Sequence, residues 1–116
     1  MRDTVIYHNP RCSKSRETLA LLREHGIEPE IVEYLQTPPN ADELKSILRK
    51  LGLPAQAIMR VKEPEYLQLG LANARYTEDG LIELLVRHPK LIERPIVVKG
   101  DKAAIGRPPE DVLAIL

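Results

Sequence analysis

The stretch that decides the fold runs from residue 4 to residue 26 and reads "TVIYHNPRCSKSRETLALLREHG". Its first four residues are β-branched or aromatic, which predicts a strand that ends at the turn-forming Asn9-Pro10 pair. From Ser13 to His25 the apolar side chains recur at a helical period, and Gly26 supplies the usual left-handed end of a helix. A strand, a loop and a helix therefore follow one another within this stretch.

Further predicted strands later in the chain complete a sheet with this first strand. Residues 30–34 ("EIVEY") alternate between polar and apolar, as a second strand would, and a strand-helix-strand order implies a parallel pair joined by a right-handed crossover. Residues 96–98 and 102–105 read as two further strands joined by a Gly100-Asp101 turn, which predicts an antiparallel hairpin. A last helix is expected from Pro108-Pro109 to the end of the chain.

The middle of the chain, about residues 38–88, is expected to be helical. Asn40 and Glu43 have the spacing of a reciprocal helix cap, and Thr77 has the position of a cap for a later helix. The predicted fold is therefore a single α/β domain over residues 1–116, with a mixed sheet of about four strands in the order β-α-β, helical insertion, β-β-α.

Composition excludes several classes of function. The 116 residues carry 17 Lys plus Arg against 17 Asp plus Glu, so a zero net charge offers no field for nucleic acid or an anionic membrane. No apolar run approaches the ~20 residues of a membrane-spanning helix. The first residues show no signal-peptide pattern, so a cytoplasmic location is expected. Nothing in the sequence demands an oligomer, and a monomer is expected.

The single cysteine, Cys12, is the main candidate for chemistry. One cysteine cannot form an internal disulfide, and one cysteine with three scattered histidines matches no zinc pattern, so no metal site is expected. A lone cysteine is commonly a small buried apolar residue. Here it should lie at the amino end of the first helix, where unpaired N–H groups lower a thiol pKa. A protonated His8 would act in the same direction, although His8 could equally be a hydrogen-bonded turn residue.

The spacing around Cys12 separates two kinds of thiol enzyme. Ser15 stands where a dithiol oxidoreductase carries its second cysteine, so the pattern is C-x-x-S, a single-thiol centre. An oxidised Cys12 could then be restored only by a thiol from another molecule. A phosphatase-type C-x5-R loop is excluded, because Thr18 occupies the arginine position.

Four segments together carry a resemblance to a known family: "YHNPRCSKSR", "MRVKEPEYLQLGL", "HPKLIERPIVV" and "GRPPEDVL". With them the chain resembles the glutaredoxin-linked arsenate reductase family nearly from end to end, in a short form without the C-terminal tail of well-known members. The resemblance implies a thioredoxin-like fold with a helical insertion.

The resemblance also implies roles for particular residues. Cys12 matches the nucleophile, and His8 matches the histidine that helps to lower its pKa. The oxyanion is expected to be held by three arginines, namely Arg60, Arg94 and Arg107. The supporting positions implied are Ser15 and Arg16, which match the family's "SR", and Pro95, for which a cis Arg94-Pro95 bond is expected. Three converging guanidinium groups would form a local positive pocket in a neutral protein.

The implied reaction is the reduction of arsenate to arsenite through an adduct between arsenic and the Cys12 thiolate. Glutathione is the implied cosubstrate and glutaredoxin the implied protein partner, with no bound cofactor and no metal.

Two other functions fit the same scaffold. One is a glutathione-dependent thiol/disulfide reductase with another substrate, which would have no use for an oxyanion pocket. The other is an RNA-polymerase-binding regulator of the Spx type, whose redox-sensing members carry C-x-x-C rather than the C-x-x-S of this sequence.

Overall fold

The structure is a computed structural model that describes residues 3–70 and 76–116. The chain divides into two compact units. The first contains the described residues up to Thr37 together with Arg94–Leu116, and the second contains Pro38–Glu93 apart from residues 71–75, which lie outside the described residues. The grouping of residues 1–116 into one domain with an insertion at about 38–88 stays a prediction.

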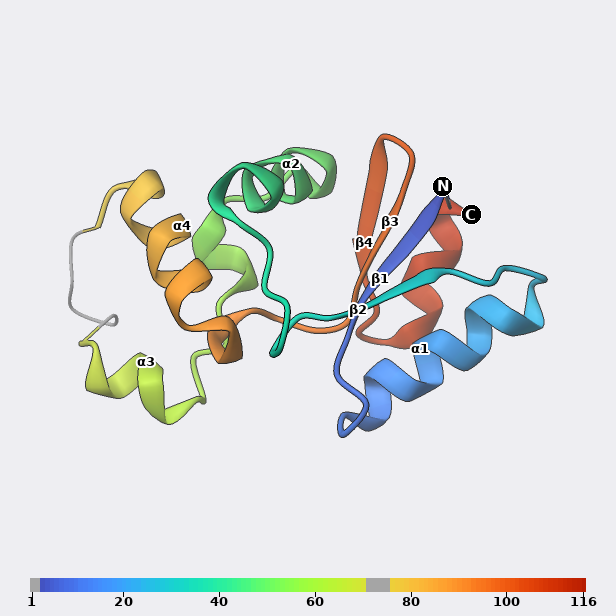
Figure 1. The fold of residues 1–116 in the computed structure, drawn as a ribbon, viewed down its shortest axis with the longest axis horizontal. Coiled ribbons are helices and arrows are strands. Elements are labelled where there is room, and N and C mark those ends of the chain that lie inside the picture. The colour runs from blue at the N-terminus through green and yellow to red at the C-terminus, as the bar shows by residue number, and fades with distance from the viewer. Residues whose placement is uncertain (1–2, 71–75) are drawn as a thin grey trace. The chain divides into compact units, whose positions relative to one another are not determined.

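The first unit is built on a mixed sheet of four strands in the order β2-β1-β3-β4 (Figure 1). Its strands are β1 (Thr4–His8), β2 (Glu30–Glu33), β3 (Ile96–Lys99) and β4 (Lys102–Ile105). β1 pairs with β2 in parallel and with β3 antiparallel, and β3 and β4 form an antiparallel hairpin. The parallel pair and the hairpin predicted from the sequence are both confirmed.

The core of this unit lies between the sheet and two helical segments, α1 (Ser13–Glu24) and the 3₁₀ helix η3 (Pro109–Ile115). Ile6 of β1 and Val97 of β3 are register partners, and both are fully buried with Leu22 of α1 and Val112 of η3. The colours of Figure 1 show α1 (blue) and η3 (red) running beside each other. The helix expected at the end of the chain is present as the tighter 3₁₀ form.

The second unit is helical, as predicted for this part of the chain. Its elements are α2 (Ala41–Leu51), the 3₁₀ helix η1 (Ala55–Ile58), the short α3 (Pro64–Gln68), α4 (Glu78–Arg87) and the 3₁₀ helix η2 (Pro89–Leu91). Apolar side chains on one face of α2 and one face of α4 are buried, among them Leu44, Ile47 and Leu85. The reciprocal cap predicted at Asn40 and Glu43 is formed in full.

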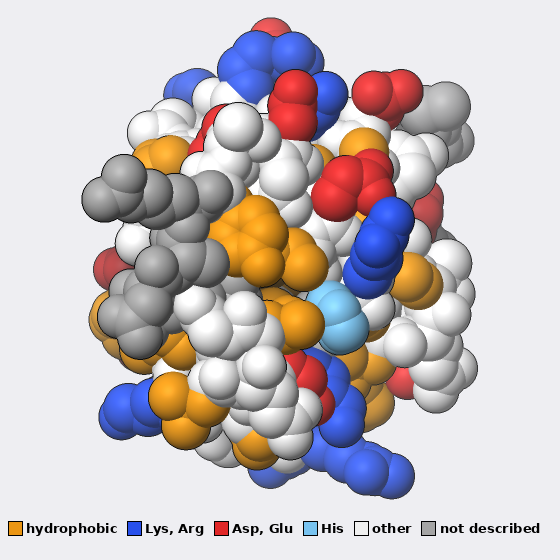
Figure 2. Space-filling view, turned by 90° about the vertical axis from the view of Figure 1, so that its left-hand side faces the viewer, with side chains coloured by type: hydrophobic (Ala, Val, Ile, Leu, Met, Phe, Trp, Pro, Cys, Tyr) orange, Lys and Arg blue, Asp and Glu red, His pale blue; other side chains and the backbone are white. Residues whose placement is uncertain are grey.

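Charged side chains of both signs lie at the surface of the second unit, among them the ion pairs Lys45–Asp79 and Arg87–Glu83. On the face that carries α3 and α4, acidic and basic side chains stand around an apolar area (Figure 2). No helix within residues 3–70 and 76–116 has the length and apolar character needed to cross a bilayer.

Candidate active site

A tight turn after β1 places Cys12 at the first turn of α1. The Cys12 N–H donates to the Asn9 carbonyl oxygen at 3.0 Å, and the Arg11 N–H donates to the Asn9 side-chain oxygen at 3.0 Å. The Cys12 carbonyl accepts the first helical hydrogen bond, from the Arg16 N–H at 3.0 Å. Cys12 is therefore the N-cap residue of α1, partly exposed and with a free thiol, where the sequence predicted it.

The surroundings of the thiol favour its ionised form. Burial alone would raise the pKa of Cys12, because it removes water from the thiolate. Hydrogen bonds from the Ser15 and Lys14 N–H groups, the positive charge of Arg94 and a hydrogen bond from its side chain act in the opposite direction and together hold the pKa below its ordinary value. The donors around the sulfur are amide and guanidinium N–H groups, which suit an anion.

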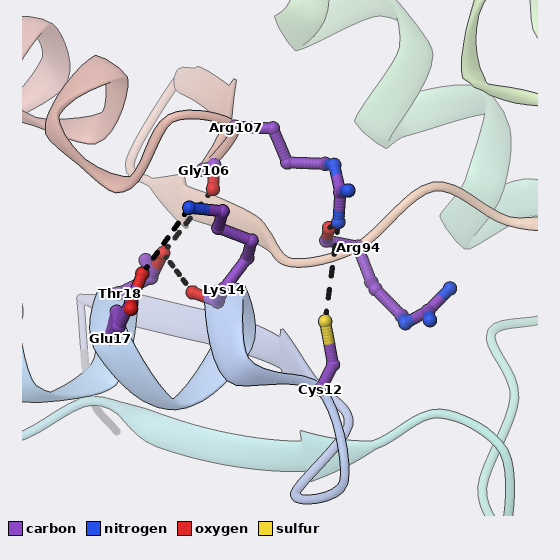
Figure 3. Close-up of polar contacts among 7 residues, drawn as sticks. All are labelled: Cys12, Lys14, Glu17, Thr18, Arg94, Gly106 and Arg107. Carbon is purple, nitrogen blue, oxygen red and sulfur yellow. Dashed lines mark hydrogen bonds and ion pairs between the residues drawn. The ribbon is translucent and has the colours of Figure 1, made fainter.

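The β3–β4 hairpin brings two of the predicted arginines to the sulfur. Arg94 precedes β3 and Arg107 follows β4, and the antiparallel pairing of Ile96 with Ile105 places these two ends at the same edge of the sheet. Arg107 Nη1 lies 4.0 Å from Cys12 Sγ and 3.3 Å from the Arg94 carbonyl oxygen, to which it donates (Figure 3). Sequence positions 12, 94 and 107 therefore meet in one site.

Both arginines are followed by prolines in the cis form. The Arg94–Pro95 peptide is cis, as expected from the resemblance. The Arg107–Pro108 peptide is also cis, which the sequence analysis did not predict.

His8 and Ser15 form a buried pair beneath the Cys12 loop. The Ser15 hydroxyl lies 2.6 Å from His8 Nδ1 and accepts the Asn9 N–H at 3.1 Å. Burial lowers the pKa of His8, Glu33 opposes this shift, and Arg16 and Arg23 reinforce it. A lowered pKa favours the neutral form of the His8 imidazole. The sequence left open a protonated His8 and a hydrogen-bonded turn residue; in the structure His8 is buried at the end of β1 and lies within hydrogen-bond distance of the Ser15 hydroxyl.

The other cations of the loop are engaged at the surface. Lys14 Nζ lies 3.7 Å from a Glu17 carboxylate oxygen, and Arg16 Nη1 donates to the Pro10 carbonyl at 2.9 Å. Both side chains are exposed. Lys14 therefore acts on the thiol through its backbone N–H, and Arg16 fastens the loop to the helix.

Arg60, the third predicted arginine, belongs to the second unit. Its Nε lies 3.6 Å from a Glu63 carboxylate oxygen, and its backbone N–H donates to the Leu91 carbonyl at 2.7 Å. Its Nη1 is buried and has no hydrogen-bond partner among the residues that the structure describes. Its membership of the oxyanion site stays a prediction. Within the described ranges, no three His, Cys, Asp or Glu side chains gather where they could hold a metal ion.

Two residues beside the site were missed by the sequence analysis as site residues. Thr18 is fully buried, and Gly106 directly precedes Arg107. Thr18 Oγ1 lies 3.5 Å from the Gly106 carbonyl oxygen (Figure 3). One signal could have indicated Gly106: it is a glycine next to a candidate arginine at the end of a predicted strand, where no turn requires it.

The fold and the site together define a class. A free thiol at a helix N-terminus, beside two arginines delivered by a β-hairpin, on a four-stranded mixed sheet, is the arrangement of a single-thiol protein with the thioredoxin-like fold.

Comparison with known proteins narrows this class to a family. Residues 7–115 match the ArsC family, and the chain belongs to that family. It is 57% identical to "Uncharacterized protein YfgD" of Escherichia coli K12 over 116 residues, which are 99% of this chain and 98% of the relative. It is 52% identical to "Arsenate reductase" of Neisseria meningitidis serogroup B, covering 100% of both chains. The solved structure "Arsenate reductase from Vibrio cholerae" is 52% identical, with a TM-score of 0.95 over 99% of this chain and 98% of that chain. The resemblance seen in the sequence is confirmed.

Proposed function

We propose that this protein reduces arsenate to arsenite with Cys12 as the nucleophile. The observation that carries the proposal is the position of the Cys12 sulfur at the N-terminus of α1, 4.0 Å from Arg107 Nη1 and with a lowered pKa. A thiolate is the reactive form of cysteine, and guanidinium and helix N–H donors bind tetrahedral oxyanions. The names of the Neisseria and Vibrio relatives support the same substrate.

The first step joins substrate and protein. Arsenate is held by the N–H groups at the start of α1 and by Arg94 and Arg107, which neutralise its charge and allow a thiolate to approach it. The Cys12 thiolate attacks arsenic, an As–S bond forms, and one As–O bond breaks with the oxygen leaving as water after protonation. Arsenic remains in the +5 state in this adduct.

The reduction itself needs two electrons from outside the chain, because Cys12 is the only cysteine in the sequence. We propose that glutathione replaces a second arsenic oxygen, which also leaves as water, to give a Cys12–S–As–S–glutathione intermediate. A glutaredoxin thiolate then attacks the glutathione sulfur, a mixed disulfide forms, and the electron pair of the broken As–S bond reduces arsenic to the +3 state. Water releases arsenite and returns Cys12 as a thiol.

The remaining assignments complete this proposal. Arg60 is the third oxyanion ligand, His8 acts through its bond to Ser15, and Arg16 and Pro95 support the loop and the arginine segment. The partners are arsenate, glutathione and glutaredoxin, with no bound cofactor or metal, and the protein acts as a monomer. Because the reaction consumes glutathione, its place is the reducing cytoplasm.

The test measures arsenite formation from arsenate in the presence of glutathione, glutaredoxin and a system that recycles them. Wild type should produce arsenite, and Cys12→Ser should fall to the level without protein. Ser13→Ala changes an exposed neighbour at the same helix end and should retain activity. Equal rates in wild type and Cys12→Ser, or no arsenite from either, would contradict the proposal.

A further inference from the structure

Three segments that are distant in the sequence meet at a junction near the N-terminus of α1. The Thr18 hydroxyl on α1 donates to the Lys14 carbonyl at 2.8 Å and lies 3.5 Å from the Gly106 carbonyl oxygen. The Gly106 N–H donates to the Pro95 carbonyl at 2.9 Å. Thr18, Gly106 and Pro95, named here the Thr18–Gly106 junction, therefore connect the first helical turns to both ends of the hairpin.

Gly106 is needed at this junction because of space. Its φ lies outside the left-handed region, so the backbone conformation alone does not require glycine. A Cβ added to Gly106 would lie 2.5 Å from Thr18 Oγ1, 3.1 Å from Thr18 Cγ2 and 2.9 Å from Pro95 Cγ. Contacts this short force neighbouring groups to move. Any side chain at position 106 would thus push the hairpin ends away from α1.

The junction is directly connected along the chain to the groups that form the oxyanion site. Arg107 directly follows Gly106, and Arg94 directly precedes Pro95. Thr18 bonds to the carbonyl of Lys14, within the helical turn whose N–H groups face the Cys12 sulfur. The attraction between a guanidinium and a thiolate weakens with distance, and water between them weakens it further. The spacing at the junction therefore sets how strongly both arginines act on the sulfur.

We propose that Thr18 and Gly106 are positioning residues of the oxyanion site, acting as a spacer that holds the Arg94 and Arg107 segments at a fixed separation from the N-terminus of α1. Gly106 permits the close approach, and the buried Thr18 side chain limits it. This inference rests on the proposed function, because it assigns both residues to the site of the Cys12 reaction.

The experiment measures the pKa of Cys12 from the rate of iodoacetamide alkylation as a function of pH, in protein whose folding is checked by circular dichroism. Only the thiolate reacts, and the chain has one cysteine, so the rate reports on Cys12 alone. Gly106→Ala should raise this pKa by about one unit, the size of shift that accompanies the loss of a nearby charge. A purely structural role would lower the melting temperature and leave the pKa of the folded protein unchanged.

A second substitution that relieves the clash at Gly106 distinguishes a spacer role from a general disturbance of the fold. The double variant Thr18→Ala/Gly106→Ala removes the two closest Thr18 atoms, so its Cys12 pKa should lie between those of Gly106→Ala and wild type. Thr18→Ser keeps the hydroxyl and should remain near wild type. The matched glycine control is Gly80→Ala in α4, where an added Cβ would approach Thr77 Oγ1 only to 3.2 Å, and the Cys12 pKa should not change.

A folded Gly106→Ala protein with a wild-type Cys12 pKa would overturn the proposal. If Gly106→Ala does not fold, Thr18→Ala carries the test: without the side chain that limits the approach, the hairpin ends can move closer to α1, so the Cys12 pKa should fall. An unchanged or raised value would overturn the proposal. If the Cys12 pKa of the double variant rises as far as that of Gly106→Ala, Thr18 has no part in the spacer. Alkylation involves no arsenate, so inactivity of the wild type toward arsenate would contradict the proposed function and not the spacer.

Discussion

At the scale of single residues, the ionisation of Cys12 is decided by a few donors. Partial burial costs the thiolate some of its hydration, and the Ser15 N–H, the Lys14 N–H and Arg94 more than offset this cost. His8 takes part in a different way. Its Nδ1 lies 2.6 Å from the hydroxyl of Ser15, the residue whose N–H lowers the pKa of the thiol. In the proposed site, the histidine therefore acts through the loop geometry, and the positive charge comes from the arginines.

The lowered pKa of His8 predicts how the stability of the protein depends on pH. Between the lowered pKa of the folded state and the ordinary value of 6.5, the unfolded chain binds more protons than the folded one. The contribution of His8 to the free energy of unfolding is therefore complete above pH 6.5 and is lost as the pH falls toward its folded pKa. Urea denaturation at about pH 7.5 and about pH 5.5 measures this loss.

Two variants isolate the histidine in that measurement. His8→Gln cannot titrate, so it should lose less stability than wild type between the two pH values. His25→Gln removes an exposed histidine at the C-terminus of α1 and should retain the wild-type dependence. A wild-type slope in His8→Gln would show that other groups cause the pH dependence.

At the scale of elements, local sequence signals were sufficient for most of the fold. The turn at Asn9-Pro10, the cap at Asn40 and the hairpin turn at Gly100 each depend on residues a few positions apart, and each was predicted from the sequence. The Thr18–Gly106 junction was missed because Thr18 and Gly106 are 88 positions apart, and the glycine beside Arg107 does not by itself indicate which residue it meets. The meeting of Arg94 and Arg107 at Cys12 followed from the family resemblance and not from the pattern of residues.

The cap of α2 gives a prediction at this scale. Asn40 accepts the Glu43 N–H at 2.8 Å, and the Glu43 carboxylate accepts the Asn40 N–H at 3.2 Å. Asn40→Ala leaves an N–H group of the first turn without its side-chain acceptor and should lower the free energy of unfolding by about 1 kcal/mol. Asn40→Asp keeps an acceptor at the same position and is the matched control, expected near wild type. Chemical denaturation of the three proteins measures the difference; equal losses in both variants would mean that the cap is not the cause.

At the scale of the whole molecule, the distribution of charge matters more than its sum. The net charge is zero, so a long-range field does not attract anions to this protein. The proposed anion site depends instead on short-range donors, namely helix N–H groups and the two arginines beside Cys12. A neutral molecule with a local cluster of this kind should distinguish a bound oxyanion from salt in general.

Thermal unfolding in arsenate, phosphate or sulfate, at an ionic strength matched with chloride, tests this distinction. An anion that binds only the folded state stabilises it by RT ln(1 + [L]/Kd), about 2.7 kcal/mol at a hundredfold excess over Kd, so arsenate and phosphate should raise the melting temperature of wild type. Sulfate and phosphate also stabilise proteins generally, because they are excluded from the surface, and this general rise in melting temperature should be equal in every variant.

Arg107→Ala removes a donor to the site and should retain only this general rise. Arg87→Ala removes an exposed arginine paired with Glu83 in α4 and should behave as wild type. If arsenate raises the melting temperature of Arg107→Ala as much as that of Arg87→Ala, the anion binds elsewhere. That result would contradict the assignment of Arg107 to the oxyanion site.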